Sequence, residues 1–259
     1  MKKISFKNFN RVKFIDYINR IISVDKFVAI TIEDGVMSAV PFTADHTVVK
    51  SVSCNVEDVF GGEFGVDGKF KMLFNNGNRI VEMLNTFDNE NIKLEIKYEE
   101  VDDVFVANTV TFSDSDFRFN FPCFDQRLDG GEITPEQCEA VFSDDEMLLS
   151  FNMNADTMGK ITKLITLGKD KDTFHIYLKD GAVGICEYRD SDNEDEVYNK
   201  TLVSIDDDCE DFDIEISKKS ITYLDKVAST VKVFGEKIIF CSDEDDTKLC
   251  LGVMDNEEE

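Results

Sequence analysis

The sequence has few of the features that mark enzymes, secreted proteins or membrane proteins. It contains no Trp, three Pro, two His and only 28 Lys and Arg among 259 residues. Its seven Cys form no C-x-x-C pair, and the odd number argues against a disulfide framework or a zinc site. No apolar run approaches the roughly 20 residues of a membrane helix, and residues 1–7 lack a signal-peptide apolar region. We expect a soluble protein of a reducing cytoplasm.

Catalytic and metal-binding motifs are lacking too. No P-loop, Gly-rich dinucleotide turn, G-x-S-x-G or H-E-x-x-H sequence occurs. The two histidines, His46 and His175, lie far apart, and a lone His in a strand-rich segment is more often structural than functional. Residues 190–194 resemble the start of a calcium loop, but Asp195 replaces its Gly and Thr201 its Glu. We therefore expect no enzymatic activity, no metal and no cofactor.

Short strands dominate the predicted secondary structure, because apolar residues alternate and β-branched and aromatic residues are frequent. The hairpin signal Asp34-Gly35 separates two such runs, and Asp180-Gly181 separates another two. The predicted strands are residues 26–32, 36–42, 48–52, 92–98, 104–112, 117–121, 147–153, 173–178, 183–187, 198–205, 212–216, 237–241 and 248–254.

Four segments follow a helical period instead: residues 7–24, 75–87, 154–169 and 217–232. In the first, Phe14, Ile18 and Ile21 belong to an apolar stripe, and Lys13, Tyr17 and Arg20 lie on the opposite side. The other three segments also place basic residues opposite an apolar stripe: Arg79 in the second, Lys160 and Lys163 in the third, Lys219 and Lys226 in the fourth.

Charge is sorted between these helices and the rest of the chain. The formal net charge is −26, yet the four helical segments hold 12 of the 28 basic residues and only 4 of the 54 acidic ones. Helix propensity alone could favour Lys and Arg, but Glu forms helices equally well and occurs once in these segments. The alternative is that the helices face a polyanion, while the acidic remainder prevents nonspecific binding.

The order of elements repeats along the chain, with Asp34-Gly35 and Asp180-Gly181 at equivalent positions. We predict an α+β fold of two topologically similar domains, each with antiparallel sheets and two helices. The boundaries are residues 1–122 for the first domain, 123–145 for a polar connector, 146–254 for the second domain and 255–259 for an acidic tail.

This pattern resembles the ring-shaped DNA sliding clamps, which include the tailed-phage polymerase clamps and proliferating cell nuclear antigen. The likeness covers the whole chain. Its best local matches are Gly35-Val36 followed by His46-Thr47-Val48, the passage 79–94 with Asn89-Glu90-Asn91-Ile92, and Leu251-Gly252-Val253 before the acidic tail. The composition favours a viral member, which would act in the host cytoplasm.

The resemblance implies a homotrimer whose six domains form a pseudo-sixfold ring around duplex DNA. It implies a processivity factor in DNA replication, which tethers the replicative DNA polymerase and is handled by a clamp loader. The positions that match the family's DNA-facing residues are Arg11, Lys13, Arg20, Arg79, Lys160, Lys163, Lys219 and Lys226.

Two further surfaces follow from the resemblance. Neighbouring subunits would join by strand pairing, with Phe117, Phe119 and Phe121 of one copy against Tyr198 and Leu202 of the next. Partner peptides would bind an apolar pocket lined by Val40, His46, Leu128, Cys250, Leu251, Gly252 and Val253.

Three alternatives remain open from the sequence. A monomeric clamp-fold protein could bind DNA on one basic face without encircling it. An acidic interaction protein, such as a DNA mimic, would occupy a DNA-binding partner and ignore DNA itself. A metal-dependent enzyme is the weakest alternative, because no cluster of ligands is apparent.

Overall fold

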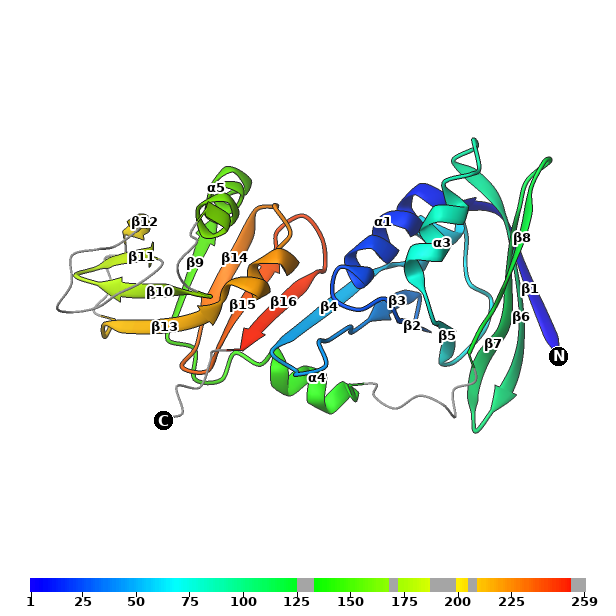
Figure 1. Ribbon diagram of the computed structural model, residues 1–259. Coiled ribbons are helices and arrows are strands. Elements are labelled where there is room, and N and C mark those ends of the chain that lie inside the picture. The colour runs from blue at the N-terminus through cyan, green and yellow to red at the C-terminus, as the bar shows by residue number, and fades with distance from the viewer. Residues whose placement is uncertain (125–132, 168–171, 187–198, 205–208, 253–259) are drawn as a thin grey trace. The chain divides into compact units, whose positions relative to one another are not determined.

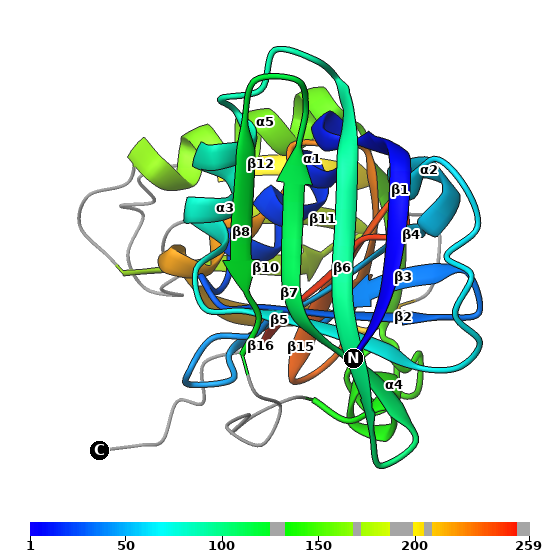
Figure 2. The ribbon, with the colours of Figure 1, turned by 90° about the vertical axis from the view of Figure 1, so that its right-hand side faces the viewer.

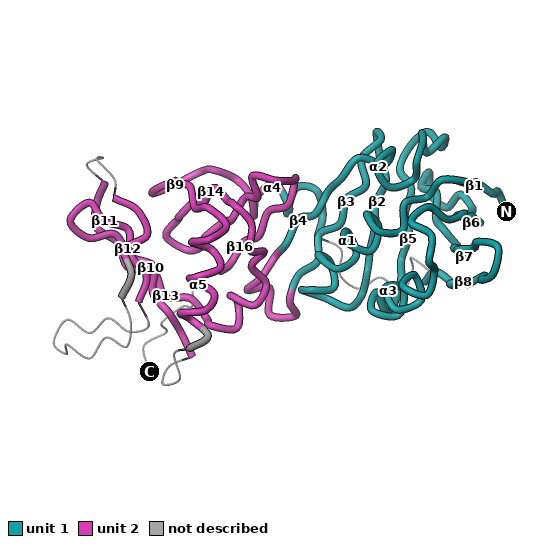
Figure 3. Tube along the Cα trace, turned by 90° about the horizontal axis from the view of Figure 1, so that it is seen from above, with its two compact units in different colours: residues 1–42, 50–138 teal, residues 43–49, 139–259 magenta. Residues whose placement is uncertain are grey.

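A computed structural model describes residues 1–124, 133–167, 172–186, 199–204 and 209–252. The chain divides into two compact units, shown in different colours in Figure 3. Unit 1 comprises residues 1–42 and 50–138, and unit 2 comprises residues 43–49 and 139–259. Both combine antiparallel strands with a few helices, so the predicted α+β class is confirmed.

Unit 1 contains most of the first half of the chain (Figure 1). Its elements are β1 (Lys2–Asn10), α1 (Arg11–Ile22), β2 (Val28–Glu33), β3 (Val36–Ala39), β4 (Val48–Asn55, whose first two residues count with unit 2), α2 (Val56–Phe60), β5 (Phe70–Phe74), α3 (Gly77–Leu84), β6 (Asn91–Val101), β7 (Val104–Ser113), β8 (Arg118–Pro122) and α4 (Pro135–Val141).

The strands of unit 1 form two antiparallel groups joined by a short parallel contact. Strands β1, β6, β7 and β8 lie side by side in that order (Figure 2), and β5, β2, β3 and β4 form the second group. The parallel contact pairs Phe70 and Lys71 of β5 with Phe105 and Val106 of β7. The hydrophobic core of this unit is rich in phenylalanine. Several of the rings meet edge to face, for example those of Phe9 and Phe14, whose centroids lie 5.1 Å apart.

Unit 2 repeats the same plan. It contains β9 (Leu149–Met153), α5 (Ala155–Leu167), β10 (Thr173–Lys179), β11 (Ala182–Cys186), β12 (Asn199–Ser204), β13 (Phe212–Ser217), the 3₁₀ helix η2 (Lys218–Tyr223), β14 (Ser229–Val233), β15 (Lys237–Ser242) and β16 (Lys248–Gly252). Strands β9, β14, β15 and β16 form one group, and β13, β10, β11 and β12 form the other. These groups match β1-β6-β7-β8 and β5-β2-β3-β4 of unit 1, which confirms the predicted architectural repeat.

The two Asp-Gly turns occupy equivalent places in this repeat. Asp34 and Gly35 join β2 to β3 with φ values of 50° and 76°, and Asp180 and Gly181 join β10 to β11 with 51° and 72°. Two successive positive φ angles are typical of a type I′ hairpin, which suits Asp followed by Gly. The predicted hairpins are confirmed.

The structure corrects three features of the predicted secondary structure. The first helix begins at Arg11 rather than residue 7, because Lys2–Asn10 pairs with β6. The fourth helix is wrong beyond Tyr223, because Ser229–Val233 alternates between buried and half-buried and pairs with β9 and β15. Strand β5 and helices α2 and α4 were not predicted; all five residues of β5 are buried, so the alternation that signals a strand is missing.

No helix in the described ranges is long and apolar enough to span a membrane.

Candidate nucleic-acid interface

In unit 1, helices α1 and α3 lie side by side and pack against each other (Figure 1). Asn10 and Asn76 cap their first turns: the Oδ1 of Asn10 accepts from the N–H of Lys13 at 3.0 Å, and that of Asn76 from the N–H of Arg79 at 3.2 Å. Burial of Phe14, Ile18, Ile21, Ile80 and Leu84 then turns Lys13, Arg20 and Arg79 toward the opposite sides of the helices.

Tyr17 departs from the expected polar face. Its side chain is buried, burial raises its pKa well above the ordinary value, and its hydroxyl has no partner among the described residues. The apolar face of α1 is therefore wider than the sequence pattern indicated.

In unit 2, helices α5 and η2 form the equivalent pair. Asn154 caps α5, because its Oδ1 accepts from the N–H of Thr157 at 2.9 Å. Met158, Ile161 and Ile165 of α5 are buried, as is Ile221 of η2. The basic residues Lys160, Lys163 and Lys219 are exposed, and so is Lys226 in the segment between η2 and β14.

The sign of the charge depends on which helix is considered. Helices α1, α3, α5 and η2 together carry eight basic and three acidic residues. Helices α2 and α4 carry two acidic residues each and no basic one. Helix propensity does not account for this division, since the two acidic helices obey the same propensities. The positive charge is specific to the helices that form a packed pair in each unit.

The eight predicted DNA-facing residues fall into three groups by their partners. Lys13, Arg20 and Lys160 form ion pairs with Asp58, Asp16 and Asp156 respectively. The guanidinium of Arg11 instead donates to the backbone carbonyl of Asn89 at 2.6 Å, which ties the start of α1 to the turn before β6. Within the described residues, no carboxylate forms an ion pair with the remaining four, which are Arg79, Lys163, Lys219 and Lys226.

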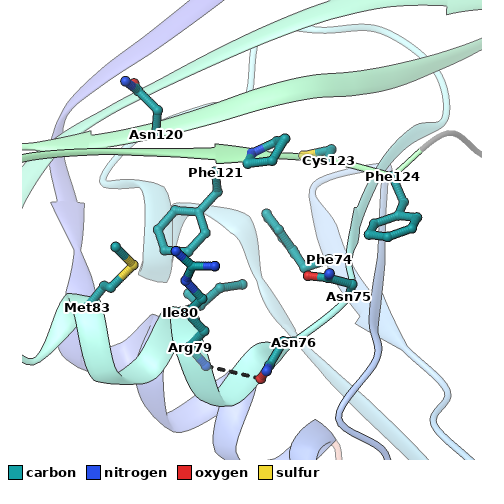
Figure 4. A pocket seen from close by; sticks show the side chains of 11 residues that line it. Phe74, Asn75, Asn76, Arg79, Ile80, Met83, Asn120, Phe121, Cys123 and Phe124 are labelled. Atoms are coloured by element: carbon teal, nitrogen blue, oxygen red, sulfur yellow. Dashed lines mark hydrogen bonds between the residues drawn. The ribbon is translucent and has the colours of Figure 1, made fainter.

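Arg79 also borders a pocket of about 440 Å³ in unit 1. Figure 4 shows Arg79, Ile80 and Met83 of α3 facing Phe121 and Cys123 at the end of β8. Burial raises the pKa of the Cys123 thiol to about 12, so the thiol is protonated at neutral pH. This pocket could not be predicted from the sequence, because its lining comes from segments distant along the chain: α3, β8 and the end of β5.

Four of the five predicted subunit-contact residues are described, and they lie on or beside edge strands. Among the described residues β8 pairs with β7 alone, and β12 pairs with β11 alone. Phe117 is 46% exposed, Phe119 and Leu202 are half-buried, and Phe121 is buried. Tyr198 lies outside the described residues.

The predicted partner-pocket residues are only partly described. Val40 belongs to unit 1, and His46 belongs to an exposed turn of unit 2 in which the N–H of Gly252 donates to the carbonyl of Thr47 at 2.8 Å. Cys250 and Leu251 are buried, and burial raises the Cys250 pKa to about 11. Leu128 and Val253 lie outside the described residues.

The turn that presents His46 is held by Asp45. The carboxylate accepts from the hydroxyl of Thr43 at 2.6 Å and from the N–H of Thr47 at 3.1 Å. These hydrogen bonds lower the Asp45 pKa, the Thr43 hydroxyl having the largest effect. His46 itself has a φ of 58°, so the backbone adopts the left-handed conformation at this residue.

His175 has a partner that suits a structural residue. Its Nδ1 lies 2.8 Å from Oδ1 of Asp213 on the neighbouring strand β13. In the part of the chain that the structure describes, no three His, Cys, Asp or Glu side chains come together as a metal site. The acidic residues 190–195 lie outside that part.

No protein-family model matches the sequence, and no curated protein matches it. Solved structures match the fold over nearly the whole chain. The beta chain of DNA polymerase III from Streptococcus pneumoniae matches 100% of this chain with 10% identity and a TM-score of 0.64. Proliferating cellular nuclear antigen from Entamoeba histolytica matches 97% with 16% identity and a TM-score of 0.67. The PCNA2–PCNA3 complex from Sulfolobus tokodaii matches 96% with 11% identity and a TM-score of 0.63.

This chain covers 66% of the S. pneumoniae beta chain, which is about two thirds of its length, but 98% of the E. histolytica chain and 99% of the S. tokodaii chain. In length it therefore corresponds to the proliferating cell nuclear antigen chains. The chain has the fold of the DNA sliding clamps.

Proposed function

We propose that this chain, which has the fold of the DNA sliding clamps, forms a homotrimeric ring around duplex DNA and acts as a processivity factor for DNA polymerase. It acts by binding, without catalysing a reaction. This proposal makes the chain a replication protein whose partners are DNA, a polymerase, a clamp loader and two further copies of itself.

The observation that carries the proposal is the placement of positive charge. In a chain of net charge −26, the helices that form a packed pair in each unit are basic, while the other two described helices are acidic. An acidic protein that mimics DNA binds its partner through negative charge, so basic helices would not contribute to its function. Lysine and arginine side chains on helices contact phosphates without reading bases, and such contacts allow a protein to move along DNA.

Edge strands support the assembly. In our proposal β8 of one copy pairs with β12 of the next, with Phe117 and Phe119 packing against Leu202. Three such contacts close a ring, and closure removes the exposed edges that otherwise promote aggregation. The S. tokodaii structure is a complex between two such chains, PCNA2 and PCNA3.

Partner recognition is assigned to the turn around His46 and the end of β16. A short apolar peptide of the polymerase or the clamp loader would bind there, beside Gly252. The variant Val253→Asp tests this assignment, because a carboxylate at an apolar contact weakens peptide binding. Unchanged affinity of a polymerase tail peptide would remove Val253 from the site.

The experiment that tests encirclement compares circular with linear DNA. The labelled protein is diluted to separate its subunits, then concentrated in the presence of a nicked circular duplex, so that rings close without a loader. Gel filtration in moderate salt then measures how much protein remains on the DNA. A ring stays on the circle and is lost after a restriction enzyme linearises it.

Two outcomes distinguish the alternatives. Equal retention on circular and linear DNA indicates a monomer that binds DNA on one face. No retention on either form, even in low salt, indicates an acidic protein that does not bind DNA.

A further inference from the structure

Three of the cations assigned to the DNA-facing surface are bound to carboxylates of the same unit. The Nζ of Lys13 lies 2.9 Å from Oδ1 of Asp58 on α2, and a guanidinium nitrogen of Arg20 lies 2.7 Å from Oδ2 of Asp16. Lys160 pairs with Asp156 in the same way on α5. The first pair joins two helices, and the other two lie one helical turn apart with the acid first, which is the favourable order.

We infer that Asp16, Asp58 and Asp156 restrain the DNA affinity of this surface by competing with phosphates for its cations. In this mechanism Lys13, Arg20 and Lys160 must leave a carboxylate before they contact DNA. The inference rests on the proposed function and adds a way in which DNA contacts are kept short-lived.

Exposure makes this exchange easy in both directions. The side chains of Asp16, Asp58 and Asp156 are 64%, 55% and 72% exposed, so water solvates each carboxylate when its cation leaves. Exposed ion pairs contribute little to stability for this reason. Contact with DNA therefore breaks ion pairs whose carboxylates are exposed, and each carboxylate can take its cation back when the phosphate contact breaks.

The remaining cations behave differently. No described carboxylate forms an ion pair with Arg79, Lys163, Lys219 or Lys226, so these four cations attract phosphates without prior exchange. The guanidinium of Arg11 donates to the backbone carbonyls of Asn89 and Asp88 instead. The surface thus has three kinds of cation. We call those without a carboxylate partner standing contacts, and Lys13, Arg20 and Lys160, which pair with the three aspartates, exchanging contacts. Arg11 has a structural role.

This division suits a protein that must move along DNA while it remains attached. Each phosphate contact adds to affinity and to its salt dependence, but a contact that persists opposes movement. A carboxylate at each exchanging cation offers an alternative partner whenever the phosphate contact breaks.

The test replaces each aspartate with asparagine, which removes the charge and retains the shape. Asp16→Asn, Asp58→Asn and Asp156→Asn are measured singly and together for binding to a short labelled duplex over a range of salt. One-dimensional diffusion on stretched DNA is measured for the triple variant. Native mass and circular dichroism establish that each variant folds and assembles as the parent does.

The chain offers matched controls in both units. Glu100→Gln breaks the exposed pair with Lys2, and Asp144→Asn breaks the exposed pair with Lys232. Both remove one negative charge, and neither lies on the paired basic helices. They report the effect of overall charge alone.

We expect each single variant to bind DNA roughly 2- to 5-fold more tightly in low salt, and the triple variant roughly 10-fold or more, with slower diffusion. The controls should change affinity by less than about 2-fold, and screening should remove the differences in high salt. Tightening of the controls by the same factor, or an unchanged triple variant, overturns the inference.

Failure of this inference is distinguishable from failure of the proposed function. If the parent protein is retained on circular DNA but the triple variant binds no more tightly, only the role of the aspartates is wrong. If neither protein binds DNA at any salt concentration, the proposed function fails and the inference fails with it.

Discussion

Gly77, the first residue of α3, lies directly against the side chain of Ile22, the last residue of α1. A Cβ atom at position 77 would also come within 2.6 Å of Cγ2 of Val28 and 3.3 Å of Cγ2 of Ile18. The two helices can therefore meet at this point only because residue 77 has no side chain. This close contact lies between the two helices that carry Lys13, Arg20 and Arg79.

We predict that Gly77→Ala destabilises the protein, because the new methyl group forces three packed side chains to move. Overpacking of this kind costs about 1–3 kcal/mol. Urea denaturation followed by circular dichroism measures the change.

Gly159 provides the matched control on α5, where an added Cβ meets nothing within 4 Å. Gly159→Ala should stabilise the protein by about 0.5–1 kcal/mol, because alanine is the better helix former. A Gly77→Ala variant as stable as Gly159→Ala would show that α1 and α3 do not pack as described.

Charge reversal at Lys163 and Lys219 tests the standing contacts of unit 2. The double variant Lys163→Glu and Lys219→Glu should lose DNA affinity by about 10-fold or more in low salt. Its affinity should also depend less steeply on salt concentration, because up to about two phosphate contacts per subunit are lost. Polymerase processivity should fall in parallel, while the native mass stays unchanged.

Lys179→Glu is the control for this pair, because Lys179 is exposed at the end of β10 and belongs to neither basic helix. If that variant lowers affinity as much as a single reversal at Lys163 or Lys219, overall charge rather than position governs binding.

Assembly is tested at the two edge strands. Phe117→Asp and Leu202→Asp should each lower the mass of the native species, because a carboxylate would be buried without a partner in the proposed contact. Val101→Asp is the control: this residue is 37% exposed and lies at the turn between β6 and β7. If only Val101→Asp disrupts assembly, the subunit contact is not formed by β8 and β12.

The turn that carries His46 gives a prediction about pH. Hydrogen bonds from Thr43 and Thr47 lower the Asp45 pKa below its ordinary value of 3.8. The ionised carboxylate is therefore favoured in the folded state, and its stabilisation is present above about pH 3.8 and is lost as the pH falls through the lowered pKa.

Asp45→Asn should consequently reduce stability at pH 7, by less than about 1 kcal/mol because the turn is exposed. The difference from the parent should shrink at pH 3 and below. Urea denaturation at both pH values measures it, and an equal difference at the two would exclude the ionised carboxylate as the cause.

Much of the fold follows from local sequence. Asp34-Gly35 and Asp180-Gly181 predict hairpins, because the turn needs two consecutive residues with positive φ and Asp and Gly adopt that conformation readily. The apolar stripe of Phe14, Ile18 and Ile21 predicts a helix. Residues 217–232 could not be assigned in this way. Ile221, Leu224, Val227 and Val231 satisfy a helical period, but pairing with β9 and β15 converts residues 229–233 into a strand.

The candidate site was only partly predictable for a related reason. Exposure of Lys163 and Lys219 follows from helical periodicity, since each lies opposite an apolar stripe. The ion pair of Lys13 with Asp58 could not be predicted in this way. Asp58 is distant in sequence and lies on α2, a five-residue helix without a clear period. The pocket beside Arg79 depends in the same way on the fold, which places α3 opposite the end of β8.

Sedimentation equilibrium in near-physiological salt tests whether three copies of this chain form a closed ring. We expect a species of roughly 88 kDa, three times the 29.5 kDa of one chain, at micromolar concentration. A mass of 29.5 kDa that persists as the protein is concentrated to about 100 μM, with or without circular DNA, would rule out the ring.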